Sequence, residues 1–168
     1  MIVIVNGLPG SGKSFFAERL AKIMRAEYVN SDRLRMEMFT NRTYSKEEKT
    51  AVYHLMLEKM KEAANGNRHI VLDATFHTNE TRKPFIQENK AELFLIEVKA
   101  GEILIKERLM KERSDSEADF KIYKLIQQEW EQLNQPHLLL ESTDDNIDDM
   151  LQKAVEYLHW KDDKRTDQ

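Results

Sequence analysis

A glycine-rich stretch near the start of the chain constrains its fold more than any other feature. Residues 3–16 read VIVNGLPGSGKSFF, where an apolar run that favours a β-strand leads directly into glycines, a lysine and a serine. Gly7, Gly12, Lys13 and Ser14 fit the pattern G-x-x-x-x-G-K-[ST]. A helical pattern follows from Lys13 onward. A strand that turns sharply through glycines and opens a helix predicts an α/β unit with a parallel sheet.

The glycine-rich stretch also predicts a chemistry. Glycines let the backbone wrap around a phosphate so that successive N–H groups point inward, at the positive end of the helix that follows. In this pattern the lysine supplies charge to the β- and γ-phosphates, and the serine hydroxyl ligates Mg²⁺. The pattern therefore predicts binding of a nucleoside triphosphate with Mg²⁺, through Gly7, Gly10, Ser11, Gly12, Lys13, Ser14 and Phe15. We expect ATP, although the pattern leaves the choice of base open. The alternative, a glycine turn beside a solvated lysine, does not explain why a strand precedes the motif and a helix follows it.

Length and composition favour one globular domain. The chain has 168 residues, of which 40% are hydrophobic and 33% charged, and we expect a domain over residues 1–160 with a polar tail over 161–168. It has no cysteine, which excludes disulfides and thiol catalysis, and its net charge of −4 provides no global basic field for nucleic acid. The opening MIVIV is too short for a signal peptide and no apolar run is long enough to span a membrane. We expect a cytoplasmic protein with no obligate protein partner.

Short apolar runs alternate with longer amphipathic patterns along the chain. The expected strands are residues 3–6, 27–30, 69–74, 93–100 and 137–141. The expected helices are residues 13–25, 31–39, 46–64, 79–90, 101–113, 116–133 and 147–158. Ser45 and Glu48, three positions apart, predict a capping box at the start of the third helix. The alternation predicts an α/β fold with a five-stranded parallel sheet and helices on both faces.

Two charged residues in VNSDRLRMEMF, residues 29–39, are candidates for contact with a phosphoryl acceptor. Asp32 follows Lys13 by one helix and one short strand, which places it at the carboxyl ends of the strands, where ligands bind in such sheets. A carboxylate there can accept the proton of an attacking hydroxyl. Arg35 follows one turn later and can hold an anionic group of the acceptor, or only pair with Asp32. Asp32 or Ser31 could instead simply cap the helix.

A second acidic candidate ends the strand in HIVLDAT, residues 69–75. An apolar strand that ends in Asp73 fits the pattern whose carboxylate holds Mg²⁺ or orients acceptor-binding residues, with a turn aspartate as the alternative. Thr75 and Arg82 lie just beyond and are further substrate candidates. Arg82 could equally be a surface charge, and Thr78 a helix cap.

A cationic cluster lies on the helix expected over residues 101–113, which follows the strand expected over residues 93–100. The cluster consists of Lys106, Arg108, Lys111 and Arg113. Arginines that close over a triphosphate neutralise the charge of the transferred phosphoryl group. Glutamates interleave with these cations, so a solvent-facing network of ion pairs is the alternative.

Taken in order, GLPGSGKSFFAERLA, VNSDRLRMEMF, IVLDATFHTNETRKPF and KERLMKERSDSEADFKIYK resemble the AAA-like group of P-loop kinases related to polynucleotide 5′-kinase and zeta-toxin-type kinases. The resemblance implies a sheet of order 2-3-1-4-5 and a helical lid around residues 102–133. It implies that Asp32 is the general base, that Arg35 binds the acceptor, and that Asp73 orients this arginine or the metal. Arg108 and Arg113 would be lid arginines.

Other nucleotide-dependent classes fit the sequence less well. The only segment that resembles the base-specifying Asn-Lys-x-Asp motif of GTPases is NKAE, residues 89–92, which precedes its strand and ends in glutamate. The sequence leaves open whether the acceptor is a small metabolite, a nucleotide or a polynucleotide 5′-end. Phe39, Tyr44 and Phe76 are candidates to stack on a base, and equally candidates for the core. A switch protein that hydrolyses ATP without an acceptor is the rival prediction.

Overall fold

The computed structural model describes residues 1–88, 92–112 and 116–160. The strands are β1 (Ile2–Asn6), β2 (Glu27–Asn30), β3 (Ile70–Ala74), β4 (Leu93–Lys99) and β5 (Leu138–Glu141). The helices are α1 (Lys13–Met24), α2 (Ser31–Met38), α3 (Lys46–Asn65), α4 (Asn79–Gln87), α5 (Glu102–Glu112), α6 (Ser116–Gln128) and α7 (Ile147–Tyr157). None of these helices combines the length and apolarity that crossing a membrane requires.

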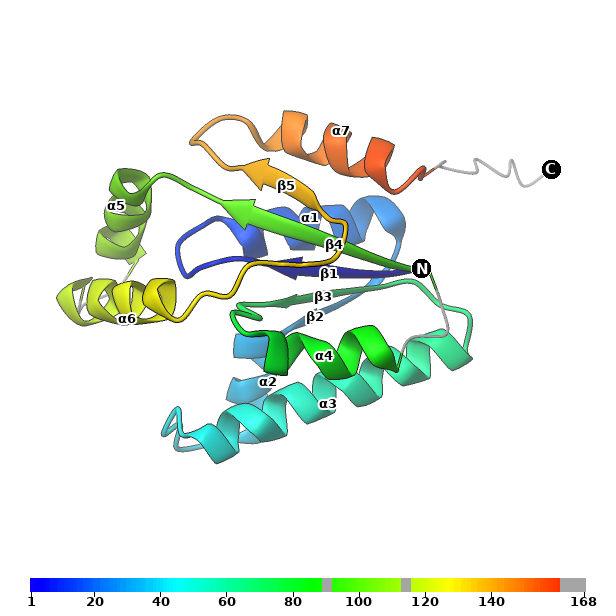
Figure 1. The fold of residues 1–168 in the computed structure, drawn as a ribbon, viewed down its shortest axis with the longest axis horizontal. Helices are drawn as coiled ribbons and strands as arrows, with labels where there is room; N and C mark the ends of the chain where they lie inside the picture. Colours follow the sequence, from blue (N-terminus) through cyan, green and yellow to red (C-terminus); the bar gives the residue numbers. More distant parts are fainter. Residues whose placement is uncertain (89–91, 113–115, 161–168) are drawn as a thin grey trace.

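The five strands form one parallel sheet in the order β2-β3-β1-β4-β5, which confirms the predicted order. The central strand β1 pairs with β3 on one side and with β4 on the other. Because all the strands run the same way, their carboxyl ends meet at one edge of the sheet, at the left of Figure 1. The loop after β1 and the segments after β2 and β3 therefore converge at that edge.

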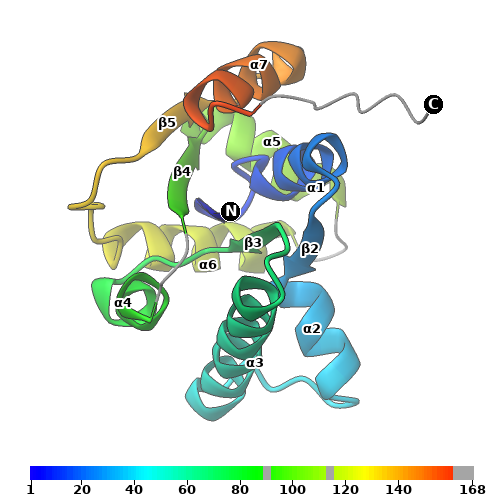
Figure 2. The same ribbon diagram turned by 90° about the vertical axis from the view of Figure 1, so that its right-hand side faces the viewer.

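Side-chain alternation along β1 divides the core into two halves. Figures 1 and 2 show α3 and α4 on one face of the sheet, and α1 and α7 on the other. Ile2 and Ile4 pack in the cluster that includes Val52, Met56 and Met60 of α3. Val3 and Val5 pack in the opposite cluster, which includes side chains of α1 and α7. Every residue of β1 and of β3 is buried, as expected for central strands covered by helices on both faces. The result is a three-layer sandwich.

Helices α5 and α6 lie beyond the carboxyl ends of the strands (Figure 1). They enclose a small cluster of their own, formed by Ile105, Leu109 and Tyr123, against which Leu8 packs. The sequence predicts that the helix beginning at residue 116 continues to residue 133. This prediction is wrong, because α6 ends at Gln128.

After Gln128 the backbone of residues 131 and 132 makes hydrogen bonds to the segment after β3 and to α4, and not to a further helical turn. The N–H of Glu131 donates to the carbonyl of His77 at 2.8 Å, and the carbonyl of Gln132 accepts from Arg82 at 3.3 Å. Leu133 then packs in the same core cluster as α3 and α4.

Candidate active site

The glycine loop between β1 and α1 has no room for side chains at its key positions. A Cβ at Gly7 would lie 2.4 Å from the carbonyl oxygen of Val98. Gly10 and Gly12 have φ angles of 77° and 87°, which side chains other than glycine rarely adopt. Gly12 caps α1, and Lys13 is the first residue of that helix. The loop thus has the tight curvature and the helix N-terminus that the motif predicted.

A buried hydrogen-bond network connects this loop to the end of β3. Asp73 is fully buried, and its Oδ2 accepts hydrogen bonds from the Tyr28 hydroxyl at 2.7 Å and from Asn30 Nδ2 at 2.6 Å. The same Asn30 amide lies 3.4 Å from Ser14 Oγ. Burial, together with the negative charge of Asp73, raises the pKa of Tyr28, so its hydroxyl stays protonated and donates. Tyr28 and Asn30 thereby fix the carboxylate of Asp73 beside the serine.

The chemistry of these oxygens fits Mg²⁺. Asp73 Oδ1 is buried and has no hydrogen-bond partner among the described residues, so it is an available acceptor. Hydroxyl and carboxylate oxygens are the ligands that Mg²⁺ prefers, usually with water and phosphate oxygens completing the octahedron. Within the described residues no group of three or more histidines and carboxylates gathers into a metal site. Ser14 and Asp73 therefore suit a metal ion that arrives with a nucleotide.

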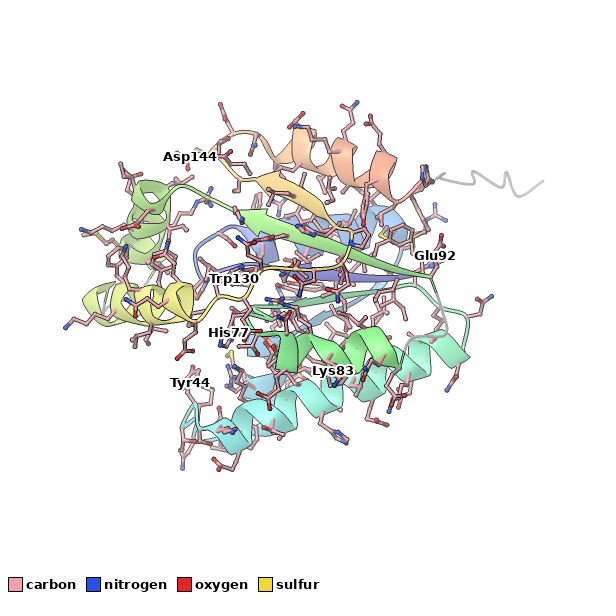
Figure 3. All side chains as sticks on the ribbon, viewed as in Figure 1. Tyr44, His77, Lys83, Glu92, Trp130 and Asp144 are labelled. Carbon is pink, nitrogen blue, oxygen red and sulfur yellow. The ribbon has the colours of Figure 1, made fainter. Side chains whose placement is uncertain are left out.

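One cavity of about 610 Å³ brings together four of the predicted site residues, since its lining includes Lys13, Asp32, Arg35 and Thr75. It opens at the carboxyl edge of the sheet, between α2, α3 and α6. Figure 3 shows Tyr44 and His77, which also line it, in the space between α6 and α3. The loop lysine and the acceptor-side carboxylate thus face the same space.

Asp32 does not cap its helix. Asn30 is the cap of α2, and its Oδ1 accepts from the N–H of Arg33 at 3.0 Å. The Asp32 side chain is 70% exposed and its Oδ1 lies 3.3 Å from Arg35 Nη1. The alternative interpretation of Asp32 as a cap is therefore wrong, and its carboxylate is accessible from the cavity.

Arg35 is held by Glu48, which the sequence predicts to be part of a capping box. Glu48 is buried, and its Oε1 lies 3.0 Å from Arg35 Nε, while its Oε2 accepts from the Thr43 N–H and hydroxyl. Ser45 Oγ accepts from the Glu48 N–H, so the first half of the predicted capping box is present. Instead of completing the box, the Glu48 side chain binds Arg35. The guanidinium also lies 4.9 Å from the centre of the Tyr44 ring.

The environment of Glu48 stabilises its charged form. Burial favours the neutral acid, but hydrogen bonds from Thr43 and the Tyr44 N–H, together with the charge of Arg35, lower the pKa of Glu48 below its ordinary value. Its contribution to stability is therefore present above the ordinary glutamate pKa and is lost as the pH falls through the lowered one. Glu48 is expected to anchor both Arg35 and the loop before α3.

Glu48→Gln is expected to destabilise the protein more at pH 7 than at an acidic pH below the lowered pKa of Glu48, because there the native carboxyl is itself protonated. Urea denaturation at both pH values measures the difference. Glu47→Gln is the matched control, since Glu47 is an exposed neighbour in the same first turn of α3. Equal destabilisation by Glu48→Gln at the two pH values would contradict the assignment.

Arg108 lies against the glycine loop. Its Nη1 donates to the carbonyl of Gly10 at 3.2 Å, and its Nη2 donates to Ser142 Oγ and to the carbonyl of Thr143. The interpretation of this residue as part of a solvent-facing ion-pair network is therefore wrong. Arg113, the second candidate lid arginine, lies outside the described residues.

Arg82 is neither a surface charge nor part of the cavity lined by Lys13. It is 3% exposed, and its guanidinium donates to the carbonyls of Phe76, His77, Glu131 and Gln132. Nη1 also donates to Asn79 Oδ1 at 2.9 Å. The guanidinium therefore ties the segment after β3 to the segment after α6, and the structure does not bring it to the predicted substrate site. Thr78 does cap α4, as one alternative predicted.

The candidate stacking residues have different environments. Phe76 is fully buried and packs edge-on against Tyr53 and Phe85, so it belongs to the core. Phe39 is partly buried against the same core. Tyr44, by contrast, is 68% exposed at the cavity rim. Phe15, which the sequence predicts to bind the nucleotide, is 54% exposed and has the guanidinium of Arg19 over its ring.

Residues 2–135 match the model of a protein family described as an AAA domain (AAA_33). The chain belongs to this family. The match confirms the resemblance to the AAA-like group that the sequence motifs indicated. A comparison with curated proteins finds no significant match.

Three solved structures illustrate the fold that this family member shares with other proteins. A sugar kinase from Janibacter sp. HTCC2649 is 16% identical, with a TM-score of 0.73 over 94% of this chain and 94% of that chain. The APS kinase CysC from Mycobacterium tuberculosis, solved with AMPPNP and APS, is 18% identical, with a TM-score of 0.72 over 95% and 97%. Kti12 from Chaetomium thermophilum, solved with ADP-AlF3, is 19% identical, with a TM-score of 0.67 over 93% and 98%. These likenesses confirm the P-loop NTPase fold.

Proposed function

We propose that the protein is a kinase that transfers the γ-phosphate of ATP to a hydroxyl group. The observation that carries the proposal is the single cavity lined by both Lys13 and Asp32. Phosphoryl transfer requires a cation at the phosphate and a carboxylate at the incoming hydroxyl, placed so that both reactants fit between them. A cavity of about 610 Å³ has room for a small acceptor beside the phosphates.

Each side chain of the site has a separate role in the proposed transfer. Lys13 and the N–H groups of the loop bind the β- and γ-phosphates. Mg²⁺ bound by Ser14 and Asp73 would neutralise charge on the phosphate oxygens. Asp32 accepts the proton of the attacking hydroxyl, and Arg35 orients the acceptor or its anionic group.

Arg108 is assigned to the nucleotide side of the site, where it donates to the loop carbonyl of Gly10. In this assignment α5 and α6 form a lid, and the guanidinium of Arg108 on α5 stabilises the phosphoryl group that is transferred. Arg113 is proposed, from the sequence resemblance alone, as a second lid arginine. Thr75 lines the acceptor cavity.

Solved proteins of this fold support the proposal. They include a sugar kinase, and an APS kinase with AMPPNP and APS bound. The net charge of −4 favours a small metabolite or nucleotide over a polynucleotide acceptor. The rival, a switch that hydrolyses ATP without an acceptor, does not explain why an accessible carboxylate and an anchored arginine face the loop lysine.

The experiment that tests the proposal offers γ-labelled ATP and Mg²⁺ to the protein with a panel of acceptors. The panel contains sugars, small alcohols, nucleosides, nucleotides and 5′-hydroxyl oligonucleotides. A labelled organic product is expected, and its identity names the acceptor class. Label recovered only as inorganic phosphate with every acceptor would favour the switch.

A further inference from the structure

A second cavity, of about 680 Å³, lies between α3 and α4, beside the proposed acceptor site. The two cavities share four lining residues: Tyr44, Lys49, Tyr53 and Glu129. Leu57, Pro84 and Phe85 form part of the second cavity, so one side of it is apolar. We call the two adjoining cavities the groove: Asp32 lines its first part, the apolar residues line its second part, and Lys49 lines both.

Lys49 stands where the two cavities meet. Its ammonium makes no ion pair in the part of the chain that the structure describes, whereas Arg35 has Glu48 and Asp32 as partners. Its Nζ lies 5.9 Å from the centre of the Tyr53 ring. Lys49 is thus a partly buried cation without a carboxylate partner at the centre of the groove.

Lys49 lies among charges of both signs, and burial is the largest influence on its ammonium. Burial lowers the pKa of Lys49, and the nearby charge of Arg35 lowers it further, while Glu129 and Glu80 oppose the shift. The Oε2 of Glu129 lies 3.4 Å from His77 Nε2, and the Glu129 side chain is 68% exposed, so water screens its attraction for Lys49. An incoming anionic group would remove the cost of the partly buried ammonium and gain a charge-assisted hydrogen bond.

We propose that Lys49 binds an anionic group of the acceptor, and that the apolar body of the same molecule occupies the α3–α4 cavity. The inference rests on the proposed kinase function, because it takes the hydroxyl end of the groove to be the end at Asp32. It narrows the acceptor to a class: an alcohol that also carries a phosphate or carboxylate and an apolar or aromatic portion. A neutral sugar or a simple alcohol would leave Lys49 and the second cavity unused.

Binding measurements test the inference without requiring catalysis. The protein is first saturated with AMPPNP and Mg²⁺, so that the glycine loop is occupied and does not compete for phosphate. Calorimetric titration with phenyl phosphate, phenylacetate, inorganic phosphate and benzyl alcohol then separates the contributions of the anion and of the ring. At least one of the two anionic aromatic probes is expected to bind about tenfold more tightly than both inorganic phosphate and benzyl alcohol.

Two variants assign this binding to the groove. Lys49→Gln is expected to weaken the tighter aromatic anion about tenfold and to leave benzyl alcohol unchanged. Thr50→Trp places an indole at the exposed rim of the α3–α4 cavity and is expected to weaken the aromatic probes but not inorganic phosphate. Lys22→Gln, an exposed lysine of α1, is the matched control and is expected to change nothing.

Aromatic anions that bind no better than inorganic phosphate, or that bind equally to wild type and Lys49→Gln, would overturn the inference. Failure of the inference and failure of the kinase proposal are distinguishable. Transfer to neutral alcohols without binding of the anionic probes would remove only the inference. Binding that depends on Lys49, without transfer to any acceptor, would remove only the kinase activity.

Discussion

Asp32→Asn is expected to lower the rate of phosphoryl transfer by about 10²–10⁴-fold while ATP affinity stays the same. The amide has nearly the same size as the carboxylate but cannot accept the hydroxyl proton. The side chain is 70% exposed and caps nothing, so the substitution should not affect folding. Single-turnover transfer of labelled γ-phosphate measures the chemical step, and calorimetry measures ATP affinity.

Asp148→Asn is the matched control for this experiment. Asp148 is also an exposed aspartate in the first turn of a helix, here α7, far along the chain from the cavity. It is expected to transfer phosphate at the wild-type rate. If Asp32→Asn also transferred at that rate, Asp32 would not be the general base.

Arg82→Met is expected to destabilise the fold by about 3–5 kcal/mol, the largest effect on stability that the structure predicts. Methionine fills part of the space but donates no hydrogen bond, so the carbonyls of Phe76, His77, Glu131 and Gln132 each lose the hydrogen bond from the guanidinium. Losing these bonds also weakens the connection between the segment after α6 and the segment after β3, which the hydrogen bond from the Glu131 N–H to the His77 carbonyl alone does not replace. The free energy of unfolding in urea measures the loss.

Arg82→Lys is expected to recover little of that stability, because a single ammonium cannot reach the carbonyls that the planar guanidinium spans. Lys83→Met is the matched control, since Lys83 is the exposed neighbour on the same helix. It should change the free energy of unfolding by less than about 0.5 kcal/mol. A loss for Arg82→Met no larger than for Lys83→Met would show that Arg82 does not tie the two segments together.

The sheet and the glycine loop were predictable because their signals are local. Every strand except β2, whose sequence EYVN is mixed, is a short and mainly apolar run. The glycine-rich motif itself predicts the positive φ angles at Gly10 and Gly12. The placement of Asp32 and Asp73 at one edge also followed, since Asp73 is the penultimate residue of β3 and Asp32 comes two residues after the end of β2.

The parts that were not predictable depend on contacts between distant segments. Glu48 looked like half of a capping box, because nothing local indicates that Arg35, on the preceding helix, would bind it. Arg82 looked like a surface or substrate residue, because its carbonyl partners at 131 and 132 lie about fifty positions away. No sequence motif marks Lys49 as a binding residue, because its position depends on two cavities that both include it in their linings.

Asn30 offers a signal that was available but unused. Asparagine directly before a helix is a strong cap candidate, which would have argued against a capping role for Asp32. Its second role, as a donor to Asp73, depends on the pairing of β2 with β3.

The central claim is that Lys13 and Asp32 act on two reactants bound in one cavity, and the dependence of ATP consumption on acceptor tests it most directly. The measurement follows labelled γ-phosphate in wild-type protein, with and without the best acceptor of the panel. The account predicts that the acceptor accelerates ATP consumption and that each γ-phosphate lost from ATP appears on the acceptor hydroxyl. ATP consumption at the same rate with and without every acceptor, with all label in inorganic phosphate, would contradict it.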